Sequence, residues 1–399
     1  MPKSKFQLVS VLISSLCSSI FAFIKFNPCR LSDFSSASVT LNACYSDIPM
    51  FWKSRLLEVH LWPYSYLPIP ELSEIIPPIE YPVIVGTIIW LLSFITPQQG
   101  IADVNYFDVN SIFLVLLFTA TNFYLFKLIK NKVFLFLFAP AVFFSLFINW
   151  DMWAVLPTIM AIYYFDRKQY KASGVLLAIA TAAKFYPIVL LLPIVCILFK
   201  RDRAKMGQYL LVFLGFYSLI NLPYVLSDFA GWKYFFEFSF DRGIGYGSIW
   251  EATGLLGLSI ANLNLFYTLT TIVVFALVTI YYLKFADLEN LHSIAFFAVF
   301  AFTVFSKVYS PQYVLWLTPL AVLALRNQRQ INFYFVWQTF ELIYHFAIWR
   351  YIYWLGLGGK MEGLAPEQYS IISLLRMFSL ILFTLSLAYP HIRKTNKLR

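Results

Sequence analysis

Polar and charged side chains beside long apolar stretches are the residues of this chain that could do chemistry. A charged side chain in the middle of a bilayer costs about 2.5–3.5 kcal/mol on an insertion scale, so its retention favours a functional role. Such residues fall in five passages: Cys44-Tyr45-Ser46-Asp47-Ile48-Pro49, Glu80-Tyr81-Pro82, Asn149-Trp150-Asp151, Ala183-Lys184-Phe185-Tyr186-Pro187 and Ser306-Lys307-Val308-Tyr309-Ser310-Pro311-Gln312-Tyr313. A carboxylate can take a proton from a hydroxyl group, and a lysine can neutralise a phosphate.

The composition indicates what must hold these side chains. Of the 399 residues 60% are hydrophobic and 13% are charged, and the mean hydropathy is +0.71. Soluble domains hold roughly 25% charged and 45–50% apolar residues, and disordered chains are less hydrophobic still. A soluble globular enzyme is therefore excluded. The composition predicts an all-α, polytopic integral membrane protein with one membrane domain over residues 1–399.

Hydrophobic stretches define the predicted membrane spans. A bilayer core about 30 Å thick takes roughly 20 apolar residues of helix. Ten spans are predicted over residues 8–26, 108–126, 133–148, 152–165, 208–227, 264–283, 291–305, 309–325, 331–349 and 369–389. Two further apolar stretches, 81–97 and 172–199, do not fit a simple crossing.

Basic residues indicate the orientation of these spans. Lys and Arg gather in cytoplasmic loops of membrane proteins. Here they cluster at Lys3/Lys5, Lys127/Lys130/Lys132, Arg167/Lys168/Lys171, Lys200/Arg201/Arg203/Lys205, Lys284, Arg326/Arg329 and Arg393/Lys394/Lys397/Arg399. Both termini are thus predicted to be cytoplasmic, and the long loops 27–80 and 228–263 extracytoplasmic. The formal charge of +10 follows these loops and does not indicate a nucleic-acid partner.

The same orientation requires two re-entrant segments. Basic loops precede and follow 172–199, so this stretch should enter the membrane and return. Pro187 removes a helical hydrogen bond and disfavours helix in its predecessor, which predicts a break at 184–187. Each arm would have about 12 residues, roughly 18 Å, which is too short to cross. Lys184 is then expected near the outer leaflet, and 81–97 is expected to leave and return on the outer side.

Five charged residues are the candidates for chemistry. Asp47, in the first long loop, is predicted to accept a proton from an attacking hydroxyl group, and Asp151 to orient the acceptor or share that work. Lys184 has no acidic neighbour in sequence, so we expect it to bind an external anion, with Lys307 and Arg242 as further phosphate ligands. Their alternatives are a solvated loop acid for Asp47, a helix cap for Asp151, a snorkelling lysine for Lys184 and surface anchors for Lys307 and Arg242.

At these positions the chain resembles the GT-C superfamily of multispanning glycosyltransferases, and most closely glycosyltransferase family 87, the polyprenol-phosphate-mannose-dependent mannosyltransferases. The resemblance extends over about residues 44–325. It rests on Lys184-Phe185-Tyr186-Pro187, Asn149-Trp150-Asp151 and Lys307-Val308-Tyr309-Ser310-Pro311-Gln312-Tyr313. It implies a GT-C-like bundle of about 10–13 transmembrane helices that includes short re-entrant half-helices.

The resemblance also implies the reaction. A sugar, expected to be mannose, would pass with inversion from a polyprenyl-phosphate donor to a glycolipid or cell-envelope glycan acceptor. The reaction would take place on the extracytoplasmic face of a bacterial plasma membrane, among membrane lipids. Tyr81, Tyr186, Gln312 and Tyr313 are the expected substrate-binding residues.

No cofactor or metal is expected. No Walker loop, dinucleotide fingerprint or paired metal-binding Cys/His spacing occurs, and the four histidines are dispersed. No Asp-x-Asp occurs in the first long loop, which departs from some GT-C members. Two other functions remain open: a lipid-linked glycan transporter or flippase, for which no matching inverted half is visible, and an envelope glycan polymerase or ligase.

Two pairs of residues carry structural predictions. Cys29 and Cys44 share the first outer loop, where oxidising conditions would permit a disulfide between them. Glu341 and Arg376 lie about 11 Å from the outer ends of consecutive spans, at 1.5 Å per residue. Antiparallel neighbours at that equal depth would form an ion pair that stabilises the bundle.

Overall fold

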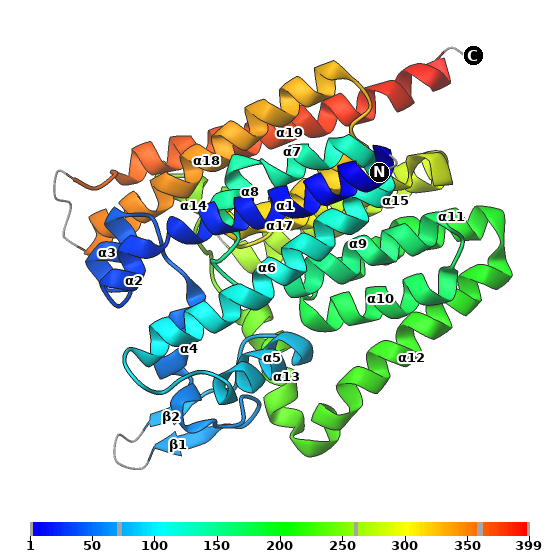
Figure 1. Ribbon diagram of the computed structural model, residues 1–399. Helices are drawn as coiled ribbons and strands as arrows, with labels where there is room; N and C mark the ends of the chain where they lie inside the picture. Colours follow the sequence, from blue (N-terminus) through cyan, green and yellow to red (C-terminus); the bar gives the residue numbers. More distant parts are fainter. Residues whose placement is uncertain (1–2, 70–73, 259–261, 357–361, 397–399) are drawn as a thin grey trace.

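The computed structural model describes residues 3–69, 74–258, 262–356 and 362–396, which form a helical bundle (Figure 1). The helices are α1 (Lys3–Ile24), α2 (Asn27–Leu31), α3 (Ser36–Leu41), α4 (Asp47–Ser54), α5 (Val83–Phe94), α6 (Ala102–Ile129), α7 (Val133–Leu137), α8 (Pro140–Ser145), α9 (Met152–Asp166), α10 (Tyr170–Ala183), α11 (Leu191–Arg201), α12 (Arg203–Ser227), α13 (Phe229–Asp241), α14 (Ile249–Leu255), α15 (Leu263–Phe285), α16 (Leu291–Val304), α17 (Val314–Ala324), α18 (Gln328–Gly356) and α19 (Pro366–Asn396). Short 3-10 turns lie at η1 (Leu57–Val59), η2 (Lys130–Lys132), η3 (Tyr186–Leu190), η4 (Leu288–Asn290) and η5 (Pro311–Tyr313).

Strand structure is confined, in the described ranges, to one hairpin within the first long loop. Strand β1 (Leu67–Ile69) pairs with β2 (Glu74–Ile76) in antiparallel register, with Leu67 opposite Ile76. The rest of that loop folds into α2, α3, α4 and η1. The predicted all-α class is therefore confirmed, and residues 70–73 and 259–261 of the two long loops lie outside the described part.

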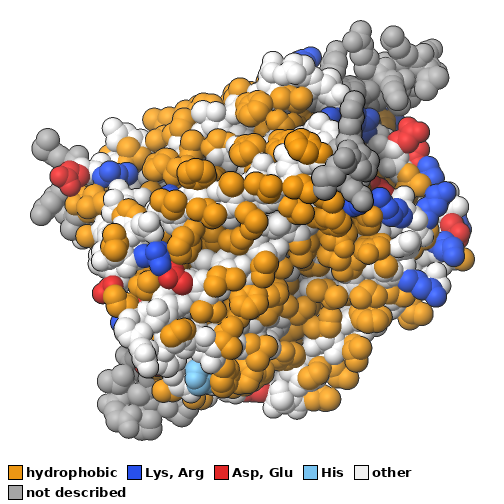
Figure 2. Space-filling view, in the orientation of Figure 1, with side chains coloured by type: hydrophobic (Ala, Val, Ile, Leu, Met, Phe, Trp, Pro, Cys, Tyr) orange, Lys and Arg blue, Asp and Glu red, His pale blue; other side chains and the backbone are white. Residues whose placement is uncertain are grey.

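Among the residues that the structure describes, five helical segments are long and apolar enough, by length and composition, to cross a membrane. They are Phe6–Ile24, Ala102–Leu137, Arg203–Ser227, Asn264–Phe285 and Pro366–Ala388. Their apolar side chains stay largely uncovered: only 11% of the apolar window of α12 and 6% of that of α15 are buried. Figure 2 shows hydrophobic side chains over the middle of the visible face. Because water would penalise such a surface, the fold is that of an integral membrane protein.

The stretch 172–199 is broken where the proline predicts. Helix α10 ends at Ala183, Lys184 takes an extended conformation, and η3 and α11 follow. With 14 and 11 residues, α10 and α11 are about 21 and 17 Å long, which is less than a full crossing. Helix α5, in the other doubtful stretch, has 12 residues and is similarly short, at about 18 Å.

The predicted span 133–148 is wrong as a single helix. The chain forms two short helices there, α7 and α8, with a break between them. Pro140 explains the break, because its ring pushes Ala139 out of the helical region, to φ −67° and ψ 117°. Hydropathy alone had not distinguished this broken segment from a continuous crossing.

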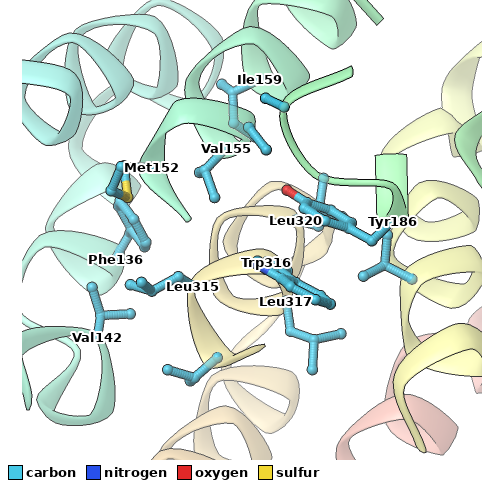
Figure 3. Close-up of a cluster of buried hydrophobic side chains, with 14 of the residues drawn as sticks. Phe136, Val142, Met152, Val155, Ile159, Tyr186, Leu315, Trp316, Leu317 and Leu320 are labelled. Atoms are coloured by element: carbon cyan, nitrogen blue, oxygen red, sulfur yellow. The ribbon is translucent and has the colours of Figure 1, made fainter. Parts of the chain in front are cut away.

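The two chain ends lie at the same end of the bundle. Figure 1 shows the start of α1, the end of α19 and the connection between α11 and α12 on one side, and α2, α3, α4 and the hairpin on the other. In the middle of the bundle α9 packs on α6, α10 and α17, while α18 packs on α19 and α1 on α6. In Figure 3, side chains of α9 such as Met152 and Val155 face Leu315 of α17 across this core.

The disulfide between Cys29 and Cys44 is present, and both residues are buried. It closes a 15-residue separation, for which loop closure is worth about 3 kcal/mol in the chain-entropy model. We expect the double variant Cys29→Ser/Cys44→Ser to lose roughly that stability, measured as a lower thermal midpoint in detergent. Cys17→Ser, at an exposed free cysteine, is the matched control and should melt like wild type. Equal midpoints for all three proteins would contradict a structural role.

The predicted ion pair between Glu341 and Arg376 is confirmed. Arg376 Nε donates to Glu341 Oε2 at 2.7 Å, and both side chains are almost fully buried. The guanidinium also donates to the carbonyl oxygens of Tyr309 and Ser310, and Glu341 Oε1 accepts from Tyr309 Oη and Trp337 Nε1. The pair thus joins α18 and α19 to the segment that leads into η5.

Breaking this pair from one side should be costly. Arg376→Met leaves the Glu341 carboxylate buried without its cation, at a cost of about 3–5 kcal/mol. We expect this variant to give little folded protein on size-exclusion chromatography, whereas Glu341→Gln/Arg376→Met should recover much of it. The two variants are compared by their yield of folded protein, so the double variant need not regain activity. A double variant no more stable than the single one would show that the charge pair is not the cause.

Candidate active site

The start of α4 is fixed against the turn that precedes α9. The backbone N–H of Asp47 donates to the carbonyl oxygen of Ile148 at 2.8 Å, and Ser46 Oγ donates to that of Phe147 at 2.7 Å. Ser46 Oγ also accepts from the N–H of Ile48, which caps the helix. These bonds hold Asp47 beside the Asn149-Trp150-Asp151 passage, about a hundred residues further along the chain.

Asp47 accepts one hydrogen bond on each carboxylate oxygen. Tyr45 Oη donates to Oδ1 at 2.7 Å, and Asn149 Nδ2 donates to Oδ2 at 2.6 Å. Asn149 Nδ2 also bonds the Oη of Tyr81 at 2.6 Å. Asp47, the predicted base, and Tyr81, a predicted substrate-binding residue, therefore both contact Asn149, for which the sequence predicts no role.

Lys184 lies on the other side of the same asparagine. Its Nζ donates to Asn149 Oδ1 at 3.1 Å, lies 3.4 Å from Asp151 Oδ1 and lies 4.4 Å from the centre of the Tyr81 ring. Asp151 Oδ1 also accepts from Trp316 Nε1 at 2.8 Å. Asp47, Tyr81, Asp151 and Lys184 are thus brought together, and we call them, with Asn149, the Asn149 cluster.

The structure corrects two sequence-based expectations, one for Lys184 and one for Asp151. Lys184 does have an acidic partner, Asp151, which packing brings to it from a distant position. Asp151 stands at the N-cap of α9, but its side chain makes no capping hydrogen bond. An ammonium group has three donors, and the hydrogen bond of Lys184 to Asn149, together with its ion pair to Asp151, leaves at least one of them for a ligand.

Asp151 keeps one oxygen without a partner. Its side chain is fully buried, and Oδ2 has no hydrogen bond among the described residues, although Oδ1 accepts from Trp316 Nε1 and pairs with the Lys184 ammonium. A buried carboxylate oxygen without a donor costs free energy. A hydroxyl group of a bound molecule would satisfy it.

Three aromatic rings form one wall of the cluster. Tyr186 stacks on Trp316 with ring centres 4.3 Å apart, as Figure 3 shows, and Tyr313 stacks on the same indole at 3.8 Å. Gln312 precedes Tyr313 in η5 and is partly exposed. Aromatic faces of this kind bind the apolar faces of ring-shaped ligands while their polar edges donate hydrogen bonds.

Lys307 and Arg242 form a second basic group. Lys307 Nζ donates to the carbonyl oxygens of Phe240 at 2.9 Å and Arg242 at 3.2 Å, and its ammonium lies 5.3 Å from the centre of the Tyr267 ring. The Arg242 side chain is exposed. Neither forms an ion pair or hydrogen bond with the Asn149 cluster within the described ranges. The hydrogen bonds of Lys307 therefore tie it to residues 240–242 and do not join it to Lys184.

The surroundings of Asp47 change its acidity. Burial raises its pKa, and the hydrogen bonds from Tyr45 and Asn149 and the charge of Lys184 oppose that rise. Burial, followed by the charge of Asp47, raises the pKa of Tyr45, so this phenol stays protonated and donates. A carboxylate with a raised pKa is a stronger base, as general-base catalysis requires.

No group of three or more His, Cys, Asp or Glu side chains that could hold a metal ion occurs among the residues that the structure describes. No protein-family model matches the chain, and no curated protein matches its sequence.

Three residues of the site, Asn149, Tyr45 and Trp316, were not predicted from the sequence. Asn149 and Tyr45 belong to two of the five polar passages, and Trp316 follows Tyr313 at helical spacing. Whole passages therefore predict the site better than their charged residues alone.

Proposed function

We propose that this protein is an inverting glycosyltransferase that moves a sugar, mannose by the resemblance, from a polyprenyl-phosphate donor to a glycolipid or cell-envelope glycan. One observation carries the proposal. A carboxylate with a raised pKa, Asp47, and an ammonium group with a free donor, Lys184, lie on opposite sides of one amide, that of Asn149. A base and a phosphate ligand that contact the same side chain suit a reaction in which a hydroxyl group displaces the phosphate from a sugar.

In the proposed reaction Asp47 takes the proton of the acceptor hydroxyl as its oxygen attacks the anomeric carbon. The bond between that carbon and the phosphate oxygen breaks, and its electron pair leaves with the lipid phosphate. The free donor of Lys184 stabilises the charge that develops there. Attack from the face opposite the phosphate inverts the anomeric configuration.

The remaining residues would hold the sugar. The unpartnered Oδ2 of Asp151 accepts a sugar hydroxyl, while Tyr81, Tyr186, Gln312 and Tyr313 line the path of the substrate. Lys307 and Arg242, in the second basic group, bind lipid phosphate before or after the transfer step. No cofactor takes part in this scheme.

We place the site on the extracytoplasmic face of a bacterial plasma membrane, with both termini in the cytoplasm. The concentration of basic residues in the opposite set of loops supports this orientation. So does the arrangement of α1, α19 and the α11–α12 connection at one end of the bundle, away from α4 (Figure 1).

A transporter or flippase is the second candidate, because the helix broken at Lys184 resembles the interrupted helices of transporter sites. One experiment separates the two. The purified protein is incubated with a panel of labelled polyprenyl-phosphate sugars and membrane lipid extract, and the labelled product is identified by mass spectrometry and its anomeric configuration by NMR. We expect a mannosylated product of inverted configuration. Retention of configuration would contradict the mechanism, and counterflow of intact donor in proteoliposomes without any product would favour the transporter.

A further inference from the structure

The carboxamide of Asn149 stands between the two charged groups of the proposed reaction. Its side chain is buried, and Nδ2 donates to Asp47 Oδ2 at 2.6 Å and to Tyr81 Oη at 2.6 Å. Oδ1 accepts from Lys184 Nζ at 3.1 Å and from the backbone N–H of Trp150 at 2.6 Å. An amide has two hydrogens to donate and two lone pairs to accept with, so all four positions are used.

The neighbours of this amide fix which way round it lies. An ammonium group and a backbone N–H only donate, so they must face the oxygen, Oδ1. An ionised carboxylate only accepts, so Asp47 must face Nδ2. The positive end of the amide dipole is therefore directed to Asp47 and the negative end to Lys184.

The Lys184 ammonium has two carboxylates near it and pairs with one of them. It lies 3.4 Å from Asp151 Oδ1, whereas Asp47 takes part in no ion pair among the described residues. The charge of Lys184 nevertheless reaches Asp47, since it acts to lower the pKa of that carboxyl group. Opposite charges so near to each other would meet unless another group filled the space between them, and the Asn149 amide lies there.

Direct contact between Lys184 and Asp47 would remove what the proposed reaction needs. An adjacent cation lowers the pKa of an aspartate by about 1–3 pH units, and a carboxylate with a lower pKa is a weaker base. The ammonium would also donate to Asp47 a hydrogen that otherwise serves the phosphate. The other titratable groups near this carboxylate are Tyr45 before α4, Tyr81 before α5, Asp151 at the start of α9, and Glu80, which pairs with Arg55.

We propose that Asn149 is a positioning residue, whose amide keeps the Lys184 ammonium on Asp151 and away from Asp47. It thereby decides which of the two aspartates stays free to act as the base. The roles of base and phosphate ligand rest on the proposed function; the separation of the two charges by the amide does not.

The first test measures the pKa of Asp47 without turnover. Infrared difference spectra of the full-length protein in nanodiscs are recorded over a pH series, and the band of the protonated Asp47 carboxyl group is identified by its absence in Asp47→Asn. In Asn149→Ala we expect this pKa to be about 1–3 pH units lower than in wild type, because the ammonium moves into direct contact. Loss of the hydrogen bond alone acts in the opposite direction, since the bond from Asn149 lowers the pKa of Asp47. The sign of the change thus distinguishes the two effects.

Three further variants complete this comparison. Asn149→Ser should also lower the pKa of Asp47, because a serine hydroxyl is too short to span both charges, and it leaves a smaller void than alanine. Asn221→Ala is the matched control, since Asn221 is buried, uses both ends of its amide in hydrogen bonds and makes none with the Asn149 cluster among the described residues. It should leave the pKa of Asp47 as in wild type. When Asn149→Ala is added to Lys184→Met/Asp151→Asn, no ammonium remains, so the pKa should rise instead.

Two results would overturn the proposal. One is a pKa of Asp47 that stays or rises in both Asn149→Ala and Asn149→Ser, and the other is an equal fall in the background that lacks Lys184. The second test concerns rate: in Asn149→Ala the acid limb of kcat/KM should move to lower pH, and kcat should fall about tenfold or more, because the base is weaker. The expected infrared result from a protein that transfers no sugar would leave the separation of charges standing and reject the glycosyltransferase.

Discussion

Asp47→Asn is expected to lower the transfer rate by about 10²–10⁴-fold while the protein stays folded, since general-base catalysis is worth that much. The amide keeps the shape of the carboxylate, and its single carbonyl oxygen can still accept from Tyr45 or from Asn149, but it cannot take the proton of the acceptor. Because burial already raises the pKa of Asp47, a neutral replacement should not unfold the protein. Initial rates with a saturating donor, measured beside the thermal midpoint, give the comparison.

Glu58→Gln is the matched control for that experiment. Glu58 belongs to the same long loop, in η1, and its side chain is exposed, so removing its charge should leave the rate unchanged. If Asp47→Asn transfers sugar at the rate of Glu58→Gln, then Asp47 is not the base.

The pH dependence of the wild-type rate provides a second readout of the same residue. Asp47 accepts a proton only as the carboxylate, so activity is present above its folded pKa and lost as the pH falls through it. Since that pKa is raised, the acid limb of kcat/KM should lie above the usual aspartate value of about 3.9. Tyr45→Phe removes a hydrogen bond that favours the carboxylate, so its acid limb should move to still higher pH. An acid limb that Tyr45→Phe leaves in place would assign the titration to another group.

Lys184→Ala is expected to lower the transfer rate by about 10²–10³-fold, the usual loss for one group that stabilises developing charge. The reason is that, in the proposed reaction, the ammonium stabilises the charge on the leaving phosphate, while Asn149 accepts one of its hydrogen bonds and Asp151 pairs with it. The KM for the donor should rise as well, because the same phosphate is present in the ground state. Rates and KM are measured with the labelled donor used for Asp47→Asn.

This variant also leaves Asp151 buried without its cation, which by itself destabilises the fold. Lys184→Met/Asp151→Asn removes both charges together and separates the two effects. It should regain the thermal midpoint of wild type but not its rate. Lys53→Met is the surface control, because the Lys53 side chain is 77% exposed. Wild-type transfer by the double variant would show that Lys184 does not act on the phosphate.

Local signals in the sequence predicted several features correctly. Pro187 placed the break in 172–199 at Lys184, because the steric effect of proline acts on its immediate neighbours. Equal depth in consecutive spans predicted the pairing of Glu341 with Arg376, because helix rise per residue is constant. Hydropathy failed at Pro140, because an unbroken run of apolar residues over 133–148 does not reveal the break that the proline causes.

The Asn149 cluster was only half visible from the sequence. Its passages were recognised by residue type, and the expectation that Asp47 and Lys184 share a side agrees with their common contact to Asn149. That contact joins positions 102 and 35 residues away along the chain, and no periodicity encodes it. Lys307 and Arg242, equally suited by type, form no hydrogen bond or ion pair with that cluster among the described residues, and Lys307 donates to backbone carbonyl groups instead.

The sequence by itself determined the helical membrane class, the broken helix and the types of side chain available for chemistry, since hydropathy, helix rise and proline sterics act over a few residues. Tertiary packing alone decided that Asp151 pairs with Lys184, that Asn149 bonds both Asp47 and Lys184, and that α15 lines an apolar groove. The physical reason is that an ion pair or a cavity depends on which distant helices approach one another, and this follows from the packing of whole surfaces rather than from any local pattern.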